Sequence, residues 1–170
     1  RSDGARPGDV IILTKRLAVE ATSILAREKA DELSLIFDEP FLQRCRRFLH
    51  EPGISVLRDA RIAVQAGHIH AMHDPTEGGV ATALHELAAA AGVGLRIDHD
   101  RITVLPEGRA LCEAFGLDPL GTLASGSLLM TLGAAEAGIV IHALAREQID
   151  SHFIGQVVPR EQGVMLVDGP

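Results

Sequence analysis

The segment 74–79, Asp-Pro-Thr-Glu-Gly-Gly, constrains the fold of this sequence more than any other. It follows an expected strand over residues 68–72 and precedes a helical stripe of apolar residues that ends at a glycine. Asp74 can cap such a helix, Pro75 suits its first position, and Glu77 can complete a capping box. The segment therefore predicts a strand, a turn and a helix in succession.

The two adjacent glycines, Gly78 and Gly79, are not explained by a helix start. Each glycine inside a helix costs roughly 1 kcal/mol relative to alanine. Glycine is favoured where something must approach the backbone closely, and the first turn of a helix offers free N–H groups to an anion. Two explanations carry equal weight: a phosphate bound at these glycines, or close packing of the helix against the neighbouring strand.

A second turn, Ser125-Gly126-Ser127, leads into another apolar run. Its hydroxyl and amide groups could hydrogen-bond an anionic substrate, although an ordinary surface turn is the commoner explanation. No Gly-x-Ser-x-Gly surrounds either serine, so the turn is not a serine-hydrolase elbow. The chain also has no Gly-x-x-x-x-Gly-Lys-Ser/Thr phosphate loop.

Three histidines lie just before the first turn. His68 and His70 point the same way from the expected strand, and His73 follows at its end. One interpretation is a metal site of a hydrolase, because the order loosely resembles the His-x-His-x-Asp-His pattern of metallo-β-lactamase-like enzymes, but Asp74 here follows the third histidine. The favoured interpretation assigns no metal ligand and places His73 close enough to the turn to touch a substrate.

Short apolar runs alternate with helical stripes along the chain, which predicts an α+β fold with a mixed β-sheet flanked by helices. Strands are expected over residues 10–13, 68–72, 94–98, 128–132, 152–158 and 164–167, and helices over 17–31, 38–51, 56–66, 75–91, 106–115 and 134–145. Ser55 is expected to cap the third helix. The last two strands, joined by the turn 159–163, are expected to be antiparallel.

Composition narrows the functional class. A net charge of −7 and the absence of Trp and Tyr argue against a nucleic-acid binder, so any phosphate site must be local. Cys45 and Cys112 lie far apart on expected helix faces and are predicted to be buried free thiols. No apolar run approaches the roughly 20 residues that span a bilayer, and no signal peptide is evident, so we expect a cytoplasmic protein.

The polar, Gly- and Pro-containing stretch 1–9 lacks an initial Met and is typical of an interdomain linker. We therefore expect residues 1–9 to be the remnant of a linker from an N-terminal domain. Residues 10–170 are expected to form one domain, since a chain of this length can bury a continuous core.

Several segments together resemble the C-terminal domain of the aminoimidazole ribonucleotide (AIR) synthetase-like superfamily. The best local match is to hydrogenase maturation protein E, whose Asp-Pro-Thr-Arg-Gly-Gly-Leu-Ala is similar to residues 74–81. The resemblance covers nearly the whole chain in order and spacing. Its other segments are Gly8-Asp9-Val10-Ile11, Leu84-His85-Glu86-Leu87-Ala88, Gly92-Val93-Gly94, Leu105-Pro106, Ala110-Leu111-Cys112 and Gly116-Leu117-Asp118-Pro119-Leu120.

The resemblance implies a three-layer α/β/α domain that closes over ATP and substrate, while an N-terminal domain dimerises and carries most ATP and Mg²⁺ ligands. Family chemistry is phosphoryl transfer from ATP to an oxygen of a small substrate. By the same resemblance, Asp74 orders the turn or assists a metal-bound phosphate, as the catalytic candidate. Thr76, Gly78 and Gly79 contact phosphate, and residues 125–127, with His73, face the substrate.

Three departures set this chain apart from hydrogenase maturation protein E. Ser125-Gly126-Ser127 replaces an Asn-Glu-Gly turn, and Thr14-Lys15-Arg16 follows the first strand in place of a Gly-rich turn. The chain ends at Val167-Asp168-Gly169-Pro170 and not in a cysteine tail that accepts a carbamoyl group. We therefore expect a divergent relative with another acceptor; the alternative is a ligand-binding or regulatory domain that keeps the fold without catalysis.

Overall fold

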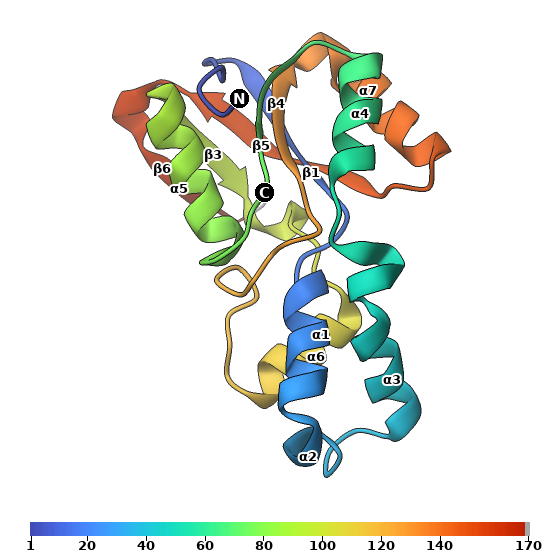
Figure 1. Cartoon of the computed structure of the whole chain (residues 1–170). Coiled ribbons are helices and arrows are strands. Elements are labelled where there is room, and N and C mark those ends of the chain that lie inside the picture. The colour runs from blue at the N-terminus through green and yellow to red at the C-terminus, as the bar shows by residue number, and fades with distance from the viewer. Residues whose placement is uncertain (169–170) are drawn as a thin grey trace.

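The computed structural model describes residues 1–168. Six strands form one sheet in the order β2-β4-β1-β5-β3-β6 (Figure 1). The strands are β1 (Asp9–Thr14), β2 (Ile69–His73), β3 (Gly94–Asp98), β4 (Leu129–Gly133), β5 (Ser151–Val158) and β6 (Val164–Val167). The α-helices are α1 (Val19–Glu28), α2 (Ala30–Leu33), α3 (Glu39–Arg47), α4 (Leu57–Ala66), α5 (Gly79–Ala91), α6 (Pro106–Ala114) and α7 (Ala134–Arg146).

Helices cover both faces of the sheet, which confirms the predicted α+β architecture in three layers. Helix α5 packs on one face, where Leu84 and Leu87 meet Ile11 of β1. Helices α4 and α7 pack on the other face, where Val140 and Leu144 belong to a second core. Side chains alternate along each strand, so one strand supplies both cores.

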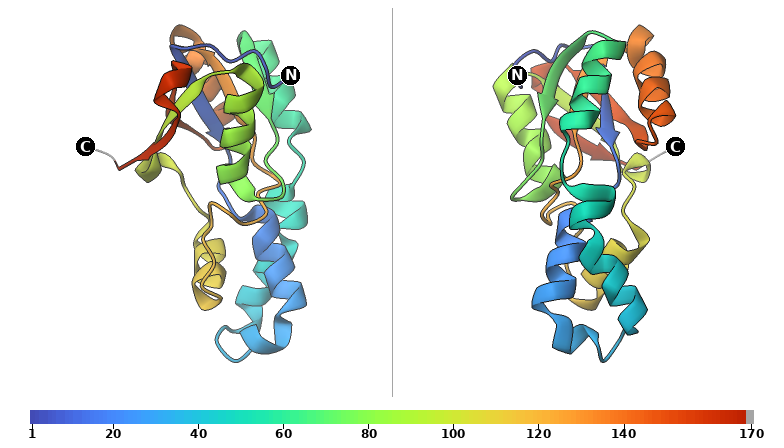
Figure 2. Two further views of the ribbon diagram at one scale, coloured as in Figure 1. Left: turned by 90° about the vertical axis from the view of Figure 1, so that its left-hand side faces the viewer. Right: turned by 45° about the vertical axis from the view of Figure 1, so that its right-hand side comes forward.

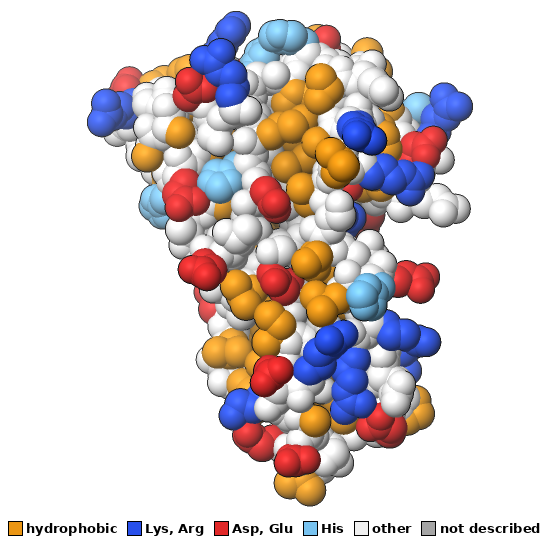
Figure 3. Space-filling view, in the orientation of Figure 1, with side chains coloured by type: hydrophobic (Ala, Val, Ile, Leu, Met, Phe, Trp, Pro, Cys, Tyr) orange, Lys and Arg blue, Asp and Glu red, His pale blue; other side chains and the backbone are white. Residues whose placement is uncertain are grey.

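A helical lobe projects from one end of the sheet (Figures 1 and 2) and forms the lower part of the molecule in the space-filling view (Figure 3). It consists of α1, α2, α3 and α6, with its own core that includes Leu33, Leu42 and Leu111. Helix α3 begins where the sequence predicts a helix to start, and Asp38 caps it, because its Oδ1 accepts a hydrogen bond from the Phe41 amide at 2.8 Å. The alternation of helices and strands gives no sign of this separate core.

Two helix starts differ from the sequence prediction. The first helix begins at Val19 and not at Leu17, because Leu17 is still extended and its amide donates to Thr103 O at 2.9 Å. That helix also breaks at Lys29, which separates α1 from α2. Helix α4 begins after Val56 without a side-chain cap, so the predicted cap at Ser55 is wrong.

The last two strands run in opposite directions, as predicted, but they do not pair with each other. Strand β3 lies between them, antiparallel to β5 and parallel to β6. The turn between β5 and β6 crosses the start of β3, where the Leu95 amide donates to Gly163 O at 2.9 Å. A Cβ on Gly94 would lie 2.6 Å from Pro159 O, so this crossing requires glycine.

The segment before β1 lies along the sheet. The Met72 amide of β2 donates to Arg1 O at 3.0 Å, and the Ser2 hydroxyl donates to Met72 O at 3.1 Å. Ala5 is buried in the core beneath α5. Residues 1–8, expected to be a linker, thus contact the same sheet as the rest of the domain.

Both cysteines are buried and free, as the sequence predicts. Burial raises the pKa of the Cys45 thiol to about 11 and raises that of Cys112 as well. No helix within residues 1–168 is long and apolar enough to cross a membrane.

Native protein should therefore react very slowly with a thiol-specific disulfide reagent at pH 8, since both thiols are protonated and inaccessible. Absorbance of the released thiolate should show two reactive groups only after the chain is unfolded in urea. Labelling of the native protein at the rate of a free thiol would contradict the burial of Cys45 and Cys112.

Candidate functional site

The turn 74–79 connects β2 to α5, but α5 begins four residues later than the sequence predicts. Gly78 is the N-cap with a φ of 77°, and Gly79 is the first helical residue with a φ of 68°. A left-handed residue at Gly78 prevents the helix from starting earlier. Asp74 therefore does not cap α5, and Pro75 is a buried turn residue outside the helix.

Close packing explains why positions 78 and 79 are glycine. A Cβ on Gly79 would overlap Leu120 O and lie 2.6 Å from Thr122 O, and a Cβ on Gly78 would overlap the Thr82 side chain. Close packing was one of the two sequence explanations, although the segment that approaches is a loop and not the neighbouring strand. Phosphate contact by Gly78 and Gly79 stays a prediction.

The structure brings the two predicted turns together. Thr76 O accepts hydrogen bonds from the Gly79 amide at 3.2 Å and from the Ala124 amide at 3.3 Å. Leu120 O accepts from the Ala81 amide of α5 at 3.0 Å. The Thr76 side chain is exposed beside this junction. The segments 74–79 and 119–127, distant in sequence, thus form one surface.

The Ser125-Gly126-Ser127 turn differs in exposure from residue to residue. Ser127 is buried, and its hydroxyl donates a long hydrogen bond of 3.4 Å to Arg16 O. Gly126 has a φ of 111°, and a Cβ there would lie 3.2 Å from the Val19 Cβ of the helical lobe. Only Ser125 is half-buried, so it is the member of the turn best placed to reach a ligand.

A buried polar network closes the end of β1 beside these turns. The Thr14 hydroxyl donates to Asp59 Oδ1 of α4 at 2.7 Å and accepts from the Leu128 amide at 3.1 Å. The Asp59 side chain is only 2% exposed. A carboxylate this deeply buried requires partners, since an unpaired charge in the interior is very costly.

Lys15 supplies the cationic partner of Asp59. Its ammonium lies 3.4 Å from Asp59 Oδ2 and donates to Ser55 O at 2.8 Å, with the side chain 12% exposed. Its backbone is left-handed, with a φ of 56°. Non-glycine residues held in this region cost free energy and cluster at functional sites. The network thus holds a lysine at the junction of sheet and lobe.

Asp74 lies within the electrostatic reach of this network. Desolvation is the largest cause that raises the pKa of its carboxyl, and Glu20 and Asp59 raise it further, while His73 and Lys15 oppose the shift. Glu20 of α1 has a buried Oε2 with no hydrogen-bond partner among residues 1–168. The charged groups of Lys15, Glu20 and Asp59 therefore lie near the Asp74 carboxyl of the turn.

The histidines take separate partners. His73 Nε2 lies 2.8 Å from Glu86 Oε2 of α5, and His70 Nδ1 lies 2.8 Å from Asp9 Oδ2. The His68 and His70 rings meet edge to face with centroids 5.1 Å apart, as expected for neighbours on one strand face. Within the described residues, no three His, Cys, Asp or Glu side chains gather in a way that could hold a metal.

Sequence reasoning missed Lys15, Glu20 and Asp59. Asp59 could have been recognised from the sequence, because it stands four residues before Ala63 on the buried side of α4, where an acidic residue is unexpected. The left-handed backbone of Lys15 could not be recognised from the residues next to it in the sequence. Glu20 reads as an ordinary first-turn acid of a helix.

Comparison with known proteins agrees with the fold. The family model of the AIR synthase related protein, C-terminal domain, matches residues 6–168. The carbamoyl dehydratase HypE of Cupriavidus necator is 36% identical over 160 residues, which cover 91% of this chain and 42% of that protein. HypE of Rhizobium leguminosarum is 32% identical over 93% of this chain and 43% of its own length. The chain thus spans less than half of these curated relatives.

Solved structures share the fold. A crystal structure of E. coli HypE superposes with a TM-score of 0.76 at 26% identity, over 98% of this chain and 48% of that one. A HypE structure in complex with ATP gives 0.73 at 23% identity, over 99% of this chain and 50% of that one. Thiamine monophosphate kinase from Aquifex aeolicus gives 0.68 at 23% identity, over 99% of this chain and 54% of that one. The last two likenesses establish the fold alone.

Replacement of Gly79 by alanine should lower the free energy of unfolding by at least about 2 kcal/mol, because the new Cβ meets the backbone of the 120–122 loop at a positive φ. Gly138→Ala is the matched control. It lies exposed within α7 with open space around it, and it should stabilise by about 0.5–1 kcal/mol. Urea unfolding followed by circular dichroism measures both; equal effects would contradict the packing at Gly79.

Lys15→Met should destabilise by about 3 kcal/mol, because it leaves the buried Asp59 carboxylate without its cation. The double variant Lys15→Met with Asp59→Asn should recover part of this loss, since the unpaired charge is gone. Thermal unfolding of both variants and of each single change forms the test. Additive effects of the two substitutions would show that the residues are not coupled.

Proposed function

Because this chain belongs to the family of AIR synthase related C-terminal domains, we propose that it is the phosphate- and substrate-facing part of an ATP-dependent enzyme. The enzyme would activate an oxygen of a small substrate by phosphoryl transfer, in a kinase-like or dehydratase-like reaction. The observation that carries this proposal is the meeting of the turn 74–79, the loop 119–127 and the end of β1 in one place.

The relatives support the class of reaction. HypE is named a carbamoyl dehydratase, and one protein with this fold was crystallised with ATP. This chain corresponds to less than half of the length of each curated relative. Where the other ligands of ATP and Mg²⁺ lie is therefore part of the proposal. We place most ATP and Mg²⁺ ligands on an N-terminal domain of the same protein and propose a homodimer as the complete assembly.

The residues of this chain offer an anionic substrate hydrogen-bond donors in fixed positions. Phosphoryl transfer needs little covalent help from a protein, so oriented charges and hydrogen-bond donors supply most of the catalysis. The exposed Thr76 hydroxyl and the half-buried Ser125 hydroxyl provide donors beside the turn, while the Lys15 ammonium is already paired with Asp59. In this proposal, the two hydroxyls bind the phosphates and the substrate.

Asp74 is the catalytic candidate of the proposal. Asp74 is exposed at the turn, and desolvation is the main cause that raises the pKa of its carboxyl, so it takes up a proton more readily than an ordinary aspartate. The carboxylate would orient the Asp-Pro-Thr turn or a proton of the substrate. His73 is paired with Glu86 and would act at the rim of the same surface.

Residues 1–168 do not provide a complete set of Mg²⁺ ligands. The carboxylates of Asp59, Asp74 and Glu20 do not gather as a metal-binding group within residues 1–168. Asp59 is already occupied by Thr14 and Lys15. The other domain would therefore hold the ion. His70 and His73 each lie against a different carboxylate, which does not favour a metal-dependent hydrolase.

The complete product of the gene should convert ATP to ADP in the presence of substrate, and Asp74→Asn should slow turnover about tenfold to a thousandfold. Thr76→Val should weaken nucleotide binding. Glu161→Gln, in the exposed turn before β6, is the matched control and should leave turnover unchanged.

Chromatographic separation of the nucleotides measures turnover, and calorimetry measures their binding. Nucleotide binding without turnover in the unaltered protein would favour the non-catalytic regulatory domain. Wild-type turnover in both the Asp74→Asn and Thr76→Val variants would refute the assignment of the site to the turn.

A further inference from the structure

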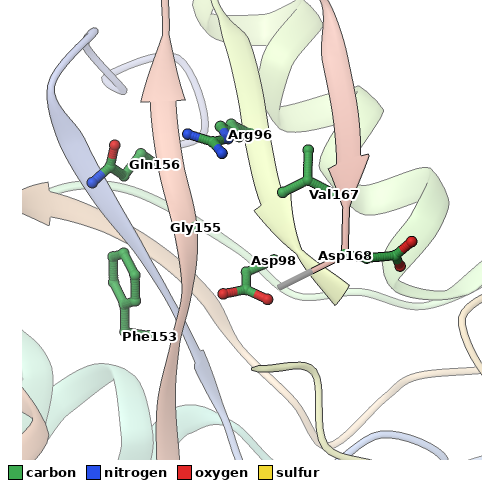
Figure 4. A pocket seen from close by; sticks show the side chains of 7 residues that line it. All are labelled: Arg96, Asp98, Phe153, Gly155, Gln156, Val167 and Asp168. Carbon is green, nitrogen blue, oxygen red and sulfur yellow. The ribbon is translucent and has the colours of Figure 1, made fainter. Parts of the chain in front are cut away.

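The two faces of the sheet differ in how the helices cover them. Helix α5 covers one face, whereas the core beneath α4 and α7 on the other face includes residues of β1, β2, β4 and β5 but, within residues 1–168, none of β3 or β6. A pocket of about 300 Å³ lies on this second face, over β5, β3 and β6 (Figure 4). The residues that line it are Arg96, Asp98, Phe153, Gly155, Gln156, Val167 and Asp168.

Strand alternation creates this pocket. Leu95 and Ile97 point into the core beneath α5, so Arg96 and Asp98 stand on the opposite face. Gln156 lies directly across from Arg96 in the ladder. Between them Gly155 contributes no side chain, and a Cβ there would overlap Arg96 O. The hollow is therefore fixed by the close approach of β5 to β3.

One carboxylate oxygen of Asp98 lacks a hydrogen-bond partner within residues 1–168. Its Oδ2 accepts from Arg101 Nε at 2.6 Å, whereas its Oδ1 is buried and has no hydrogen-bond partner within residues 1–168. A buried acceptor without a partner costs free energy, so a ligand that donates to it gains affinity. Figure 4 shows the carboxylate turned into the space between β5 and β6.

The other groups of the pocket set the character of such a ligand. Arg96 is exposed, and its side chain makes no hydrogen bond or ion pair with other residues of the range 1–168. The lining residues carry one cation, Arg96, and two anions, Asp98 and Asp168, and the neighbouring Arg101 pairs with Asp98. Phe153 offers an apolar wall, with its ring held 5.1 Å from the Arg101 guanidinium. Separated charges with an apolar side suit a zwitterion better than a polyanion.

We propose that this pocket binds a free α-amino acid with an aliphatic side chain. Its carboxylate pairs with the Arg96 guanidinium beside the Gln156 amide, and its ammonium donates to Asp98 Oδ1 and faces Asp168. Its side chain packs on Phe153 and Val167. The site lies on a different part of the sheet from the turn 74–79, so it would serve to sense or carry a metabolite independently of the proposed phosphoryl chemistry.

The probe is L-leucine, titrated into the isotope-labelled chain and followed by amide chemical shifts. Saturable shifts at Arg96, Gly155 and Gln156, with a dissociation constant of about 1 mM or below, support the proposal. N-acetyl-L-leucine lacks the ammonium and L-leucinamide lacks the carboxylate, so each should bind at least about tenfold more weakly, because each loses one charge-assisted contact. Equal binding of all three compounds, or no saturation by leucine, would overturn the site.

Arg96→Gln is the sharpest variant, because the side chain has no structural partner to lose. This substitution should lower the affinity for leucine about tenfold or more and leave the affinity for leucinamide unchanged, because it removes only the contact to the carboxylate. Arg61→Gln, exposed on α4, is the control and should change neither affinity. A melting temperature unchanged from the parent chain shows that Arg96→Gln is folded. Equal loss for leucine and leucinamide would also contradict the proposed orientation.

Discussion

Strand β1 is the constraint on which the rest of this domain depends. It is buried along its whole length and pairs antiparallel with β4 on one side and with β5 on the other. Ile11 and Leu13 complete the core beneath α5, while Val10 and Ile12 complete the core beneath α4 and α7. Because one strand supplies both cores, neither face of the sheet can lose its packing without loosening the other.

The central strand was also what the sequence predicted best. A short β-branched run at residues 10–13 leaves little choice of structure, and the helical stripes of α3, α5 and α7 are long enough to be recognised by period. The cap at Asp38 and the burial of both cysteines followed from local chemistry. Predictions succeeded where a residue's role depended on its neighbours along the chain.

The errors arose where distant segments decide the local structure. Gly78 and Gly79 look like a helix start until the 120–122 loop is seen against them, and that loop lies 40 residues away in sequence. The last strands resemble a hairpin, but β3 occupies the position between them. Lys15 and Asp59 form a pair across β1 and α4, and neither residue carries information about the other. The sequence therefore predicted the two turns of the candidate surface but not the buried network of Thr14, Lys15 and Asp59 beside them.

The helical lobe adds a property that the three-layer sheet alone would not have. Its core of Leu33, Leu42 and Leu111 is separate from both sheet cores, and the chain enters it directly beyond the left-handed Lys15 and Ala18. Regions with their own cores can open as cooperative units below the free energy of global unfolding. Val19 of this lobe lies against Gly126, so an opening of the lobe alone would remove a contact that supports the Ser-Gly-Ser turn. The order of that turn is thereby linked to the closure of the lobe against the sheet.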